Sequence, residues 1–187
     1  MNFLRTHKKI VMSVALGAIV VVGGYFLVRY FTKKESYVRT VPVVSRDVVA
    51  EAGNMTFDIK GVSVPLKDGT ATVDGLPGTV KMMSGSLEID FNKDSVMDRA
   101  VIIKNEREDD SMYFYVSVVI VGSDNVLSNT NTILLGEGTL IQRMIELPDN
   151  MFRVEYLERK NPKEAPSIPR KRTFKVEGYA LTEIVKK

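Results

Sequence analysis

The sequence has no cysteine and a single histidine, His7, among its 187 residues. The lack of cysteine excludes disulfides, thiol nucleophiles and thiolate metal sites. Because His7 precedes the first long apolar run, the rest of the chain has no Ser-His-Asp or Cys-His arrangement and none of the usual zinc sites. A glycine-rich phosphate loop is also absent. We therefore do not expect an enzyme, and the alternative that stays open is a carboxylate-based hydrolase of envelope polymers.

Basic residues are scarce outside the N-terminal segment. The formal net charge is +3, but no acidic residue precedes Glu35, and four of the basic residues are Arg5, Lys8, Lys9 and Arg29. Positions 33 to 187 hold 22 basic and 23 acidic residues, a net charge of −1. Proteins that neutralise nucleic-acid phosphates need a clustered basic surface, so we expect no nucleic-acid partner.

One long uncharged run is present, Ile10 to Val28, which reads IVMSVALGAIVVVGGYFLV. A helix of this length spans about 28 Å, close to the roughly 30 Å hydrocarbon core of a bilayer. A cleaved signal peptide is the alternative, but it would have a shorter apolar run with small residues at its cleavage site. Here Phe26, Leu27, Val28 and Arg29 close the run. The run therefore predicts an uncleaved, single-pass signal anchor that contacts the lipid bilayer.

The predicted organisation has four parts. Residues 1–9 form a cytoplasmic tail, 10–31 a transmembrane helix, 32–54 a polar tether, and 55–187 a β-rich extracytoplasmic domain. The short tail ahead of a large C-terminal part is the usual layout of a signal anchor, although the positive charges on the two sides of the span are nearly equal. We expect a short helix around Asp47 to Glu51, at the end of the tether.

Beyond residue 55 the pattern is almost entirely β. The longest candidate strand, Met112 to Val121, is nearly all aromatic or β-branched, which is typical of a central strand covered on both faces. Asp68-Gly69, between Gly61 to Leu66 and Thr70 to Val73, predicts a hairpin. We expect an antiparallel sandwich or barrel-like fold. The further predicted strands are Thr79 to Met83, Ser86 to Ile89, Ala100 to Lys104, Thr132 to Leu135, Leu140 to Glu146, Met151 to Glu155, Thr173 to Val176 and Tyr179 to Ile184.

The best candidate for a ligand site is the loop D-F-N-K-D-S-V-M-D, from Asp90 to Asp98. Calcium prefers six to eight oxygen ligands, and alternating side chains on a tight loop can converge on one ion. Ser95 occupies the position where calcium loops have glycine, and no bidentate Glu follows at position 12. The alternative is an Asx-rich turn that bonds its own backbone. The candidate ligands of a weak calcium site are Asp90, Asn92, Asp94, Asp98 and the carbonyl of Val96.

Four stretches resemble, in order, motifs of a group of small, uncharacterised bacterial exported or membrane-anchored proteins. The loop from Asp90 to Asp98 is similar to their D-x-N-x-D-G-x-x-D loop, with Ser95 at the glycine position. The other three are Ser111 to Val116 (SMYFYV), Asn131 to Gly138 (NTILLGEG) and Phe152 to Arg159 (FRVEYLER). The likeness covers roughly Val62 to Val176, and Glu137-Gly138 replaces the Asp-Arg of the group. It implies a β-rich exported domain of unassigned function.

A basic stretch, Arg159 to Lys175, carries seven basic residues, one acidic residue and three prolines. It is either a contact for anionic headgroups or polymers, or a solvated connection between strands. The leading functional hypothesis is a membrane-anchored, extracytoplasmic, non-catalytic binding or scaffold module with a protein partner in the envelope. The first alternative is a calcium-dependent extracellular β-module.

Overall fold

The structure is a computed structural model that describes residues 48 to 185, which form a mainly β domain with antiparallel sheets, as predicted. The predicted span, Ile10 to Val28, lies outside these residues, and within them no helix has the length and apolar character needed to cross a membrane. The elements are α2 (Val48–Ala52), β1 (Thr56–Ile59), β2 (Val62–Pro65), β3 (Thr70–Val73), β4 (Leu76–Ile89), β5 (Asp98–Glu106), β6 (Met112–Val121), β7 (Leu127–Asn129), β8 (Ile133–Glu137), β9 (Leu140–Leu147), β10 (Met151–Glu158), β11 (Ile168–Glu177) and β12 (Ala180–Ile184).

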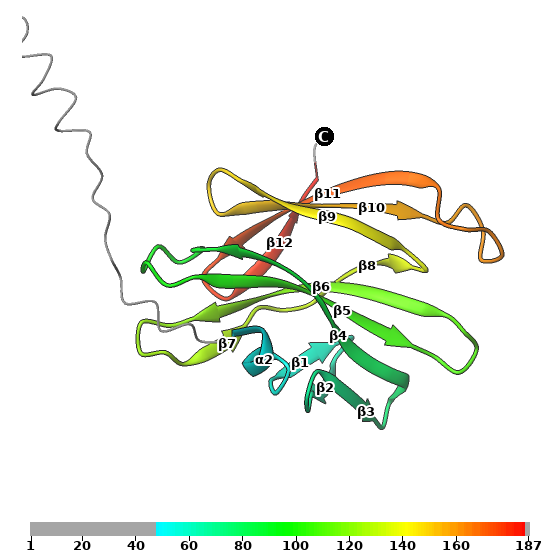
Figure 1. Ribbon diagram of the computed structural model, residues 1–187, viewed down its shortest axis with the longest axis horizontal. Coiled ribbons are helices and arrows are strands. Elements are labelled where there is room, and N and C mark those ends of the chain that lie inside the picture. Colours follow the sequence, from blue (N-terminus) through cyan, green and yellow to red (C-terminus); the bar gives the residue numbers. More distant parts are fainter. Residues whose placement is uncertain (1–47, 186–187) are drawn as a thin grey trace, which may run out of the picture. The chain divides into compact units, whose positions relative to one another are not determined.

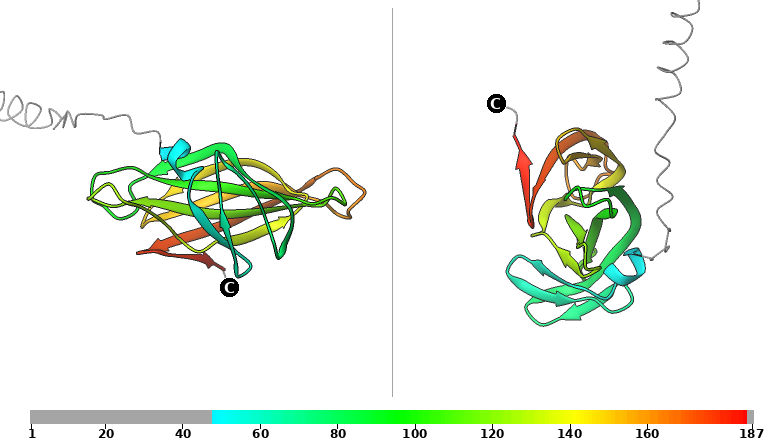
Figure 2. Two further views of the ribbon diagram at one scale, coloured as in Figure 1. Left: turned by 90° about the horizontal axis from the view of Figure 1, so that it is seen from below. Right: turned by 90° about the vertical axis from the view of Figure 1, so that its left-hand side faces the viewer.

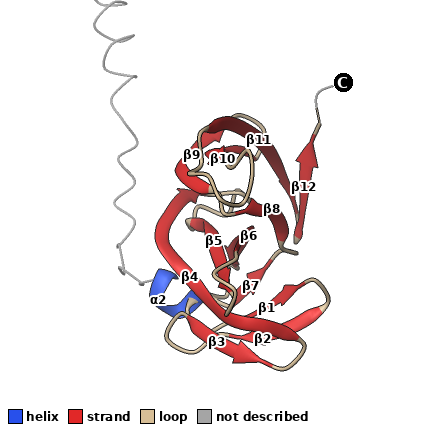
Figure 3. Cartoon of the chain, turned by 90° about the vertical axis from the view of Figure 1, so that its right-hand side faces the viewer, coloured by secondary structure: helices blue, strands red, loops and turns tan. Residues whose placement is uncertain are grey.

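The strands build three layers (Figure 1). A central sheet has the order β3-β4-β5-β6-β7, with β8 also paired to β6. A four-stranded sheet, β12-β11-β10-β9, lies over one face of the central sheet, and the β1–β2 hairpin with α2 lies over the other. The end-on view in Figure 2 separates these layers. The long strand β4 has an irregular register between Met82 and Ser86, and it bends from β3 toward β9 (Figure 3).

The central strands β5 and β6 are covered on both faces because their apolar side chains alternate between two cores. Ile102 and Val116 point toward the four-stranded sheet, while Ile103 and Tyr115 point toward α2 and the β1–β2 hairpin. Eight consecutive residues of β6 are buried. This confirms the prediction that Met112 to Val121 is a central strand with both faces covered.

The four-stranded sheet buries one face only. Along β10, Phe152, Val154 and Tyr156 are buried in the core against the central sheet. The Phe152 ring lies 5.5 Å from the Phe174 ring and 5.7 Å from the Phe91 ring, between their centroids. Burying these aromatic side chains provides a large apolar contribution to the packing of the two sheets. The residues between them point outward.

The segment between β7 and β8 connects the layers through side-chain hydrogen bonds. The Asn129 amide donates to the Thr56 carbonyl (2.7 Å), and the Thr132 hydroxyl donates to the Asp58 carbonyl (2.5 Å). The Asn131 amide donates to the Leu181 carbonyl (3.0 Å), and its oxygen accepts from the Leu181 N–H (2.8 Å). Asn131 thereby satisfies backbone groups on the open edge of β12 as a neighbouring strand would.

The predicted hairpin at Asp68-Gly69 is wrong in its pairing. The tight turn is present, because Lys67 and Thr70 form an isolated bridge, but β2 pairs with β1 and β3 pairs with β4. The turn that builds a hairpin is Lys60-Gly61, where both residues have positive φ, 57° and 80°, as a two-residue hairpin loop requires. The two predicted strands Thr79 to Met83 and Ser86 to Ile89 are parts of the single strand β4.

The short helix expected near the end of the tether is α2. Val48 and Ala52 are buried in the core under the β1–β2 hairpin. The hydrogen bond from the Gly69 N–H to the Gly53 carbonyl (2.8 Å) further joins the end of this helix to the turn before β3. The folded domain therefore includes the final residues of the segment that the sequence assigns to the tether.

Candidate functional site

The candidate calcium loop joins β4 to β5 and satisfies its own backbone. The Asp90 carboxylate accepts from the N–H groups of Asp94 (3.1 Å) and Ser95 (2.9 Å), and the Asp94 carboxylate accepts from the Val96 N–H (2.8 Å). The Asn92 amide donates to Asp94 (3.0 Å) and to the Val121 carbonyl (3.2 Å). These contacts are those of an Asx-rich turn.

Asp98 is used by the fold. It is fully buried at the start of β5, and its two carboxylate oxygens accept from the N–H groups of Phe91 and Val121, each at 2.8 Å. Burial raises the pKa of Asp98, against the opposing effect of these backbone donors. Asp98 thus fastens both the loop and the end of β6, while Asp90, Asn92 and Asp94 gather on the loop itself.

Two residues of the loop have left-handed backbones, Lys93 (φ 60°) and Ser95 (φ 71°). The conformation for which calcium loops use glycine is therefore kept at Ser95, with a residue that disfavours it. Among residues 48 to 185 there is no group of three or more His, Asp or Glu side chains arranged to hold a metal ion.

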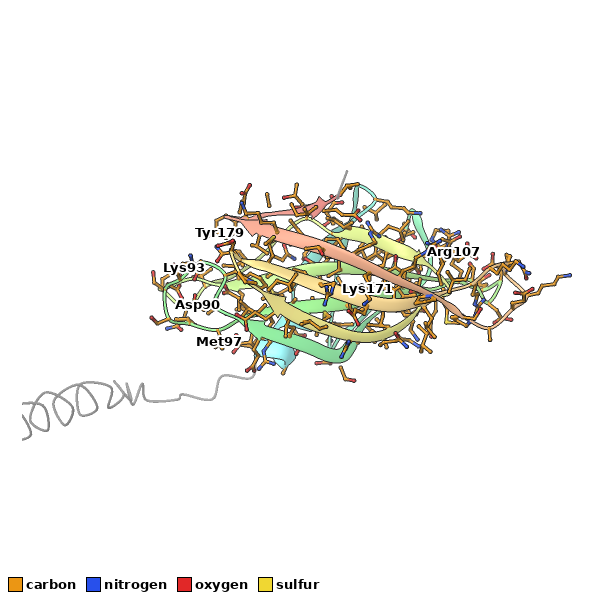
Figure 4. The ribbon with its side chains drawn as sticks, turned by 90° about the horizontal axis from the view of Figure 1, so that it is seen from above. Asp90, Lys93, Met97, Arg107, Lys171 and Tyr179 are labelled. Carbon is orange, nitrogen blue, oxygen red and sulfur yellow. The ribbon has the colours of Figure 1, made fainter. Side chains whose placement is uncertain are left out.

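A second candidate lies on the outer face of the four-stranded sheet, which no described element covers (Figure 4). The register places Arg143 of β9 and Lys171 of β11 directly opposite Glu155 of β10, one on each side. Residues that are directly opposite on antiparallel strands point to the same face, so the three side chains form a cation–anion–cation row across three strands. Arg153, two residues before Glu155, points to this face as well.

These four residues, Arg143, Arg153, Glu155 and Lys171, are called the Glu155 cluster below. The Arg143 Nε donates to Glu155 Oε2 (2.9 Å), Arg153 Nε lies 3.1 Å from Oε1, and Lys171 Nζ lies 3.5 Å from Oε1. The Glu155 side chain is only 8% exposed, whereas Arg143 and Lys171 are 65% and 62% exposed. Three cations thus surround one covered carboxylate and present unbalanced positive charge to solvent.

The arginine and lysine side chains hold the pKa of Glu155 below its usual value, with the hydrogen bond from Arg143 as the largest cause and the charges of Lys171 and Arg153 adding to it. Around the cluster, apolar side chains reach the same face. They are the partly buried Ile145, Met151 and Leu157 and the exposed Leu140. Directed cations among apolar groups can bind an anionic group and bury apolar surface next to it.

Most of the basic stretch from Arg159 to Lys175 is neutralised by folding. Arg170 pairs with Glu158 (2.6 Å), Arg172 with Glu183 (2.5 Å) and Lys175 with Glu177 (2.5 Å). Residues 160–165 form an exposed loop between β10 and β11. Only Lys171 of this stretch belongs to the Glu155 cluster, so most of the charge seen in the sequence is balanced within the sheet.

A shallow hollow of about 330 Å³ lies near the β5–β6 turn and is lined by Thr72, Gly78, Thr79, Glu106, Arg107 and Glu108. Lys81 and Lys104 both donate to Glu106, which lowers the pKa of Glu106 to about 2. At Gly78, whose φ is 91°, an added Cβ would overlap the Glu106 carbonyl oxygen, so glycine is required for β4 to approach β5 here.

Sequence reasoning did not find the Glu155 cluster, because its residues come from three strands and form no linear motif. One signal was available. The strands predicted at Leu140 to Glu146 and Met151 to Glu155, folded about Asp149-Asn150, would place Arg143 close to Glu155. Comparison of this chain with protein-family models, with curated proteins and with solved structures finds no match in any of the three.

Proposed function

We propose that this protein is a single-pass membrane protein that displays its β domain outside the cytoplasm as a non-catalytic binding or scaffold module, a subunit of an envelope assembly. The observation that carries the binding role is the outer face of the β9–β12 sheet, where unbalanced cations lie among apolar side chains. The membrane anchor rests on the nineteen uncharged residues from Ile10 to Val28.

The electrostatics of the hollow near the β5–β6 turn favour binding over catalysis there. A general acid that works near neutral pH needs a raised pKa, whereas the two lysines keep Glu106 ionised down to a pH of about 2. Glu108, the other carboxylate residue of the hollow, is exposed to solvent. This pair therefore lacks the divided acid and base roles that carboxylate hydrolases use.

Photocrosslinking in intact membranes tests the proposal. A photoreactive amino acid at Leu140, on the outer face and 54% exposed, should give a covalent adduct with a specific envelope protein. The same residue at Val126, 58% exposed in the turn between β6 and β7, is the matched control and should give none. Protease added to the outside of intact cells should digest the domain. A domain that is protected from that protease, or a chain without adducts at Leu140, contradicts the proposed function.

The second candidate function is a calcium-dependent module, favoured by the gathering of the Asp90, Asn92 and Asp94 oxygens on one loop. Here the ion would stiffen the loop and order a partner surface. Thermal melting of the full-length protein with calcium and with a chelator is the test. A ligand of the native state raises the melting temperature as its concentration rises, so identical curves would remove this candidate.

A further inference from the structure

The Glu155 cluster contains its own anionic ligand. Glu155 occupies the centre of the row, with Arg143 on one side and Lys171 on the other. Its carboxylate is 8% exposed because the long side chains of its neighbours cover it. After one carboxylate is matched with three cations, two positive charges remain, and they belong to side chains that are otherwise open to solvent.

We infer that the outer face of the β9–β12 sheet binds a segment of a partner protein that carries closely spaced carboxylates, and that Glu155 is an internal competitor that weakens this binding. This inference rests on the proposed function and names the chemistry of its partner. A partner carboxylate would pair with the exposed side of Arg143 or Lys171, which Glu155 engages from within the sheet.

The spacing of the cations fits an extended acidic segment. Arg143 and Lys171 lie on strands that flank β10, so their backbones are about 10 Å apart, twice the distance between neighbouring strands. In an extended segment, side chains two residues apart point the same way and are roughly 7 Å apart. Long, exposed cation side chains easily bridge this difference. The partly buried Ile145 and Leu157 would contact the apolar residues of such a segment.

A bilayer surface fits this face less well. Recognition of anionic lipids typically uses clusters of roughly four to eight Lys or Arg residues. The Glu155 cluster offers two unbalanced positive charges, and the nearby Lys175 is paired with Glu177. The described domain together with the last two residues holds 18 basic and 21 acidic residues. General attraction to an anionic surface is therefore weak, and binding depends on the local arrangement.

The test uses the full-length protein in phosphatidylcholine nanodiscs, titrated with a fluorescently labelled oligoglutamate peptide. The double variant Arg143→Gln/Lys171→Gln should weaken binding about tenfold, because both exposed cations are lost. The matched control is Lys160→Gln/Lys163→Gln, which removes the same charge from the exposed loop between β10 and β11. This control should change binding by less than about twofold.

The competitor role makes an opposite prediction for Glu155. Glu155→Gln should strengthen oligoglutamate binding about threefold or more, because the cations lose their internal partner. The control Glu158→Gln removes a carboxylate from the same strand that pairs with Arg170, and it should leave binding unchanged within about twofold. If Glu155→Gln does not fold, as judged by circular dichroism, the comparison of the two double variants alone decides whether the acidic segment binds here.

Several outcomes overturn the inference. Equal weakening in both double variants would show non-specific attraction, and unchanged binding in folded Glu155→Gln would remove the competitor role. Binding to nanodiscs that contain phosphatidylglycerol, without binding to oligoglutamate, would assign the face to the bilayer. Self-association in sedimentation that Arg143→Gln/Lys171→Gln abolishes would assign it to a second copy. If the Leu140 crosslink to an envelope protein survives in that variant, the proposed function stands and this inference fails.

Discussion

The strands β6 and β11 are both ten residues long, yet they occupy opposite environments. In β6 eight consecutive residues are buried, because β6 lies in the middle layer with a core on each side. In β11 only Phe174 and Val176 are buried, and charged residues occupy much of the rest. The central sheet therefore provides the folded framework, and the four-stranded sheet leaves one face for interactions. The predictions below test this division, from the largest expected effect to the smallest.

Adjacent residues of β10 should differ most in their contribution to stability. Phe152→Ala removes a fully buried ring that contacts two other rings, and it should lower the free energy of unfolding by about 3–5 kcal/mol. Arg153→Ala, on the outer face, should cost less than about 1 kcal/mol. Urea unfolding followed by circular dichroism measures both. Similar losses in the two variants would mean that the outer face is as important for folding as the core.

Asp98→Ala tests whether the buried carboxylate holds the central sheet together. The change leaves the N–H groups of Phe91 and Val121 buried without their acceptor, which should cost about 2–5 kcal/mol. Asp94→Ala, in the exposed part of the same loop, should cost less than about 1 kcal/mol. The same urea experiment distinguishes them. An Asp98→Ala variant as stable as the parent would show that the loop and β6 are held by other contacts.

Glu106 gives a prediction about pH. Its pKa is about 4.5 in an unfolded chain and about 2 in the folded domain, so its contribution is complete above pH 4.5 and is lost as the pH falls toward 2. Since the side chain is 31% exposed, Glu106→Gln should cost about 1 kcal/mol at pH 7. Melting curves of parent and variant should converge at low pH. Glu108→Gln is the control, and a pH-independent difference for Glu106→Gln would contradict the ion-pair explanation.

Ser95→Gly should stabilise the domain slightly. Glycine adopts the left-handed conformation at position 95 (φ 71°) without steric cost, while it also increases the freedom of the unfolded chain. We expect a net gain of about 0.5 kcal/mol, measured as a higher midpoint in urea. Gly61→Ser, at the left-handed position of the β1–β2 turn (φ 80°), is the reverse control and should lower the midpoint. A Ser95→Gly variant of lower stability would mean that the serine side chain contributes a stabilising contact.

The sequence predicted the central sheet better than its surroundings. Met112 to Val121 matches β6 residue for residue, because a strand covered on both faces has a continuous apolar run. β7 is only three residues long and was missed, since so short a strand carries no periodic signal. The pairing of β2 with β1 was also missed, because it depends on positive φ at Lys60, which the residue type does not indicate.

The candidate sites differ in the same way. The Asp90 loop is a local motif, so its residues could be named from spacing, although spacing does not reveal that both oxygens of Asp98 accept from buried backbone groups. The Glu155 cluster depends on the register of three strands, and in the sequence Glu155 is one acidic residue among 23. Pairing partners, rather than composition, distinguish it.

The hydrogen bonds of Asn129, Asn131 and Thr132 have a consequence for the time at which the domain can form. They join residues separated by 50 to 74 positions, and Asn131 binds β12, which ends at Ile184. Contacts over such separations slow folding, because the intervening chain must be ordered first. The layers are therefore complete only after nearly the entire chain has emerged from the ribosome. For a domain exported through a membrane, this order of events keeps the chain unfolded until translocation is almost finished.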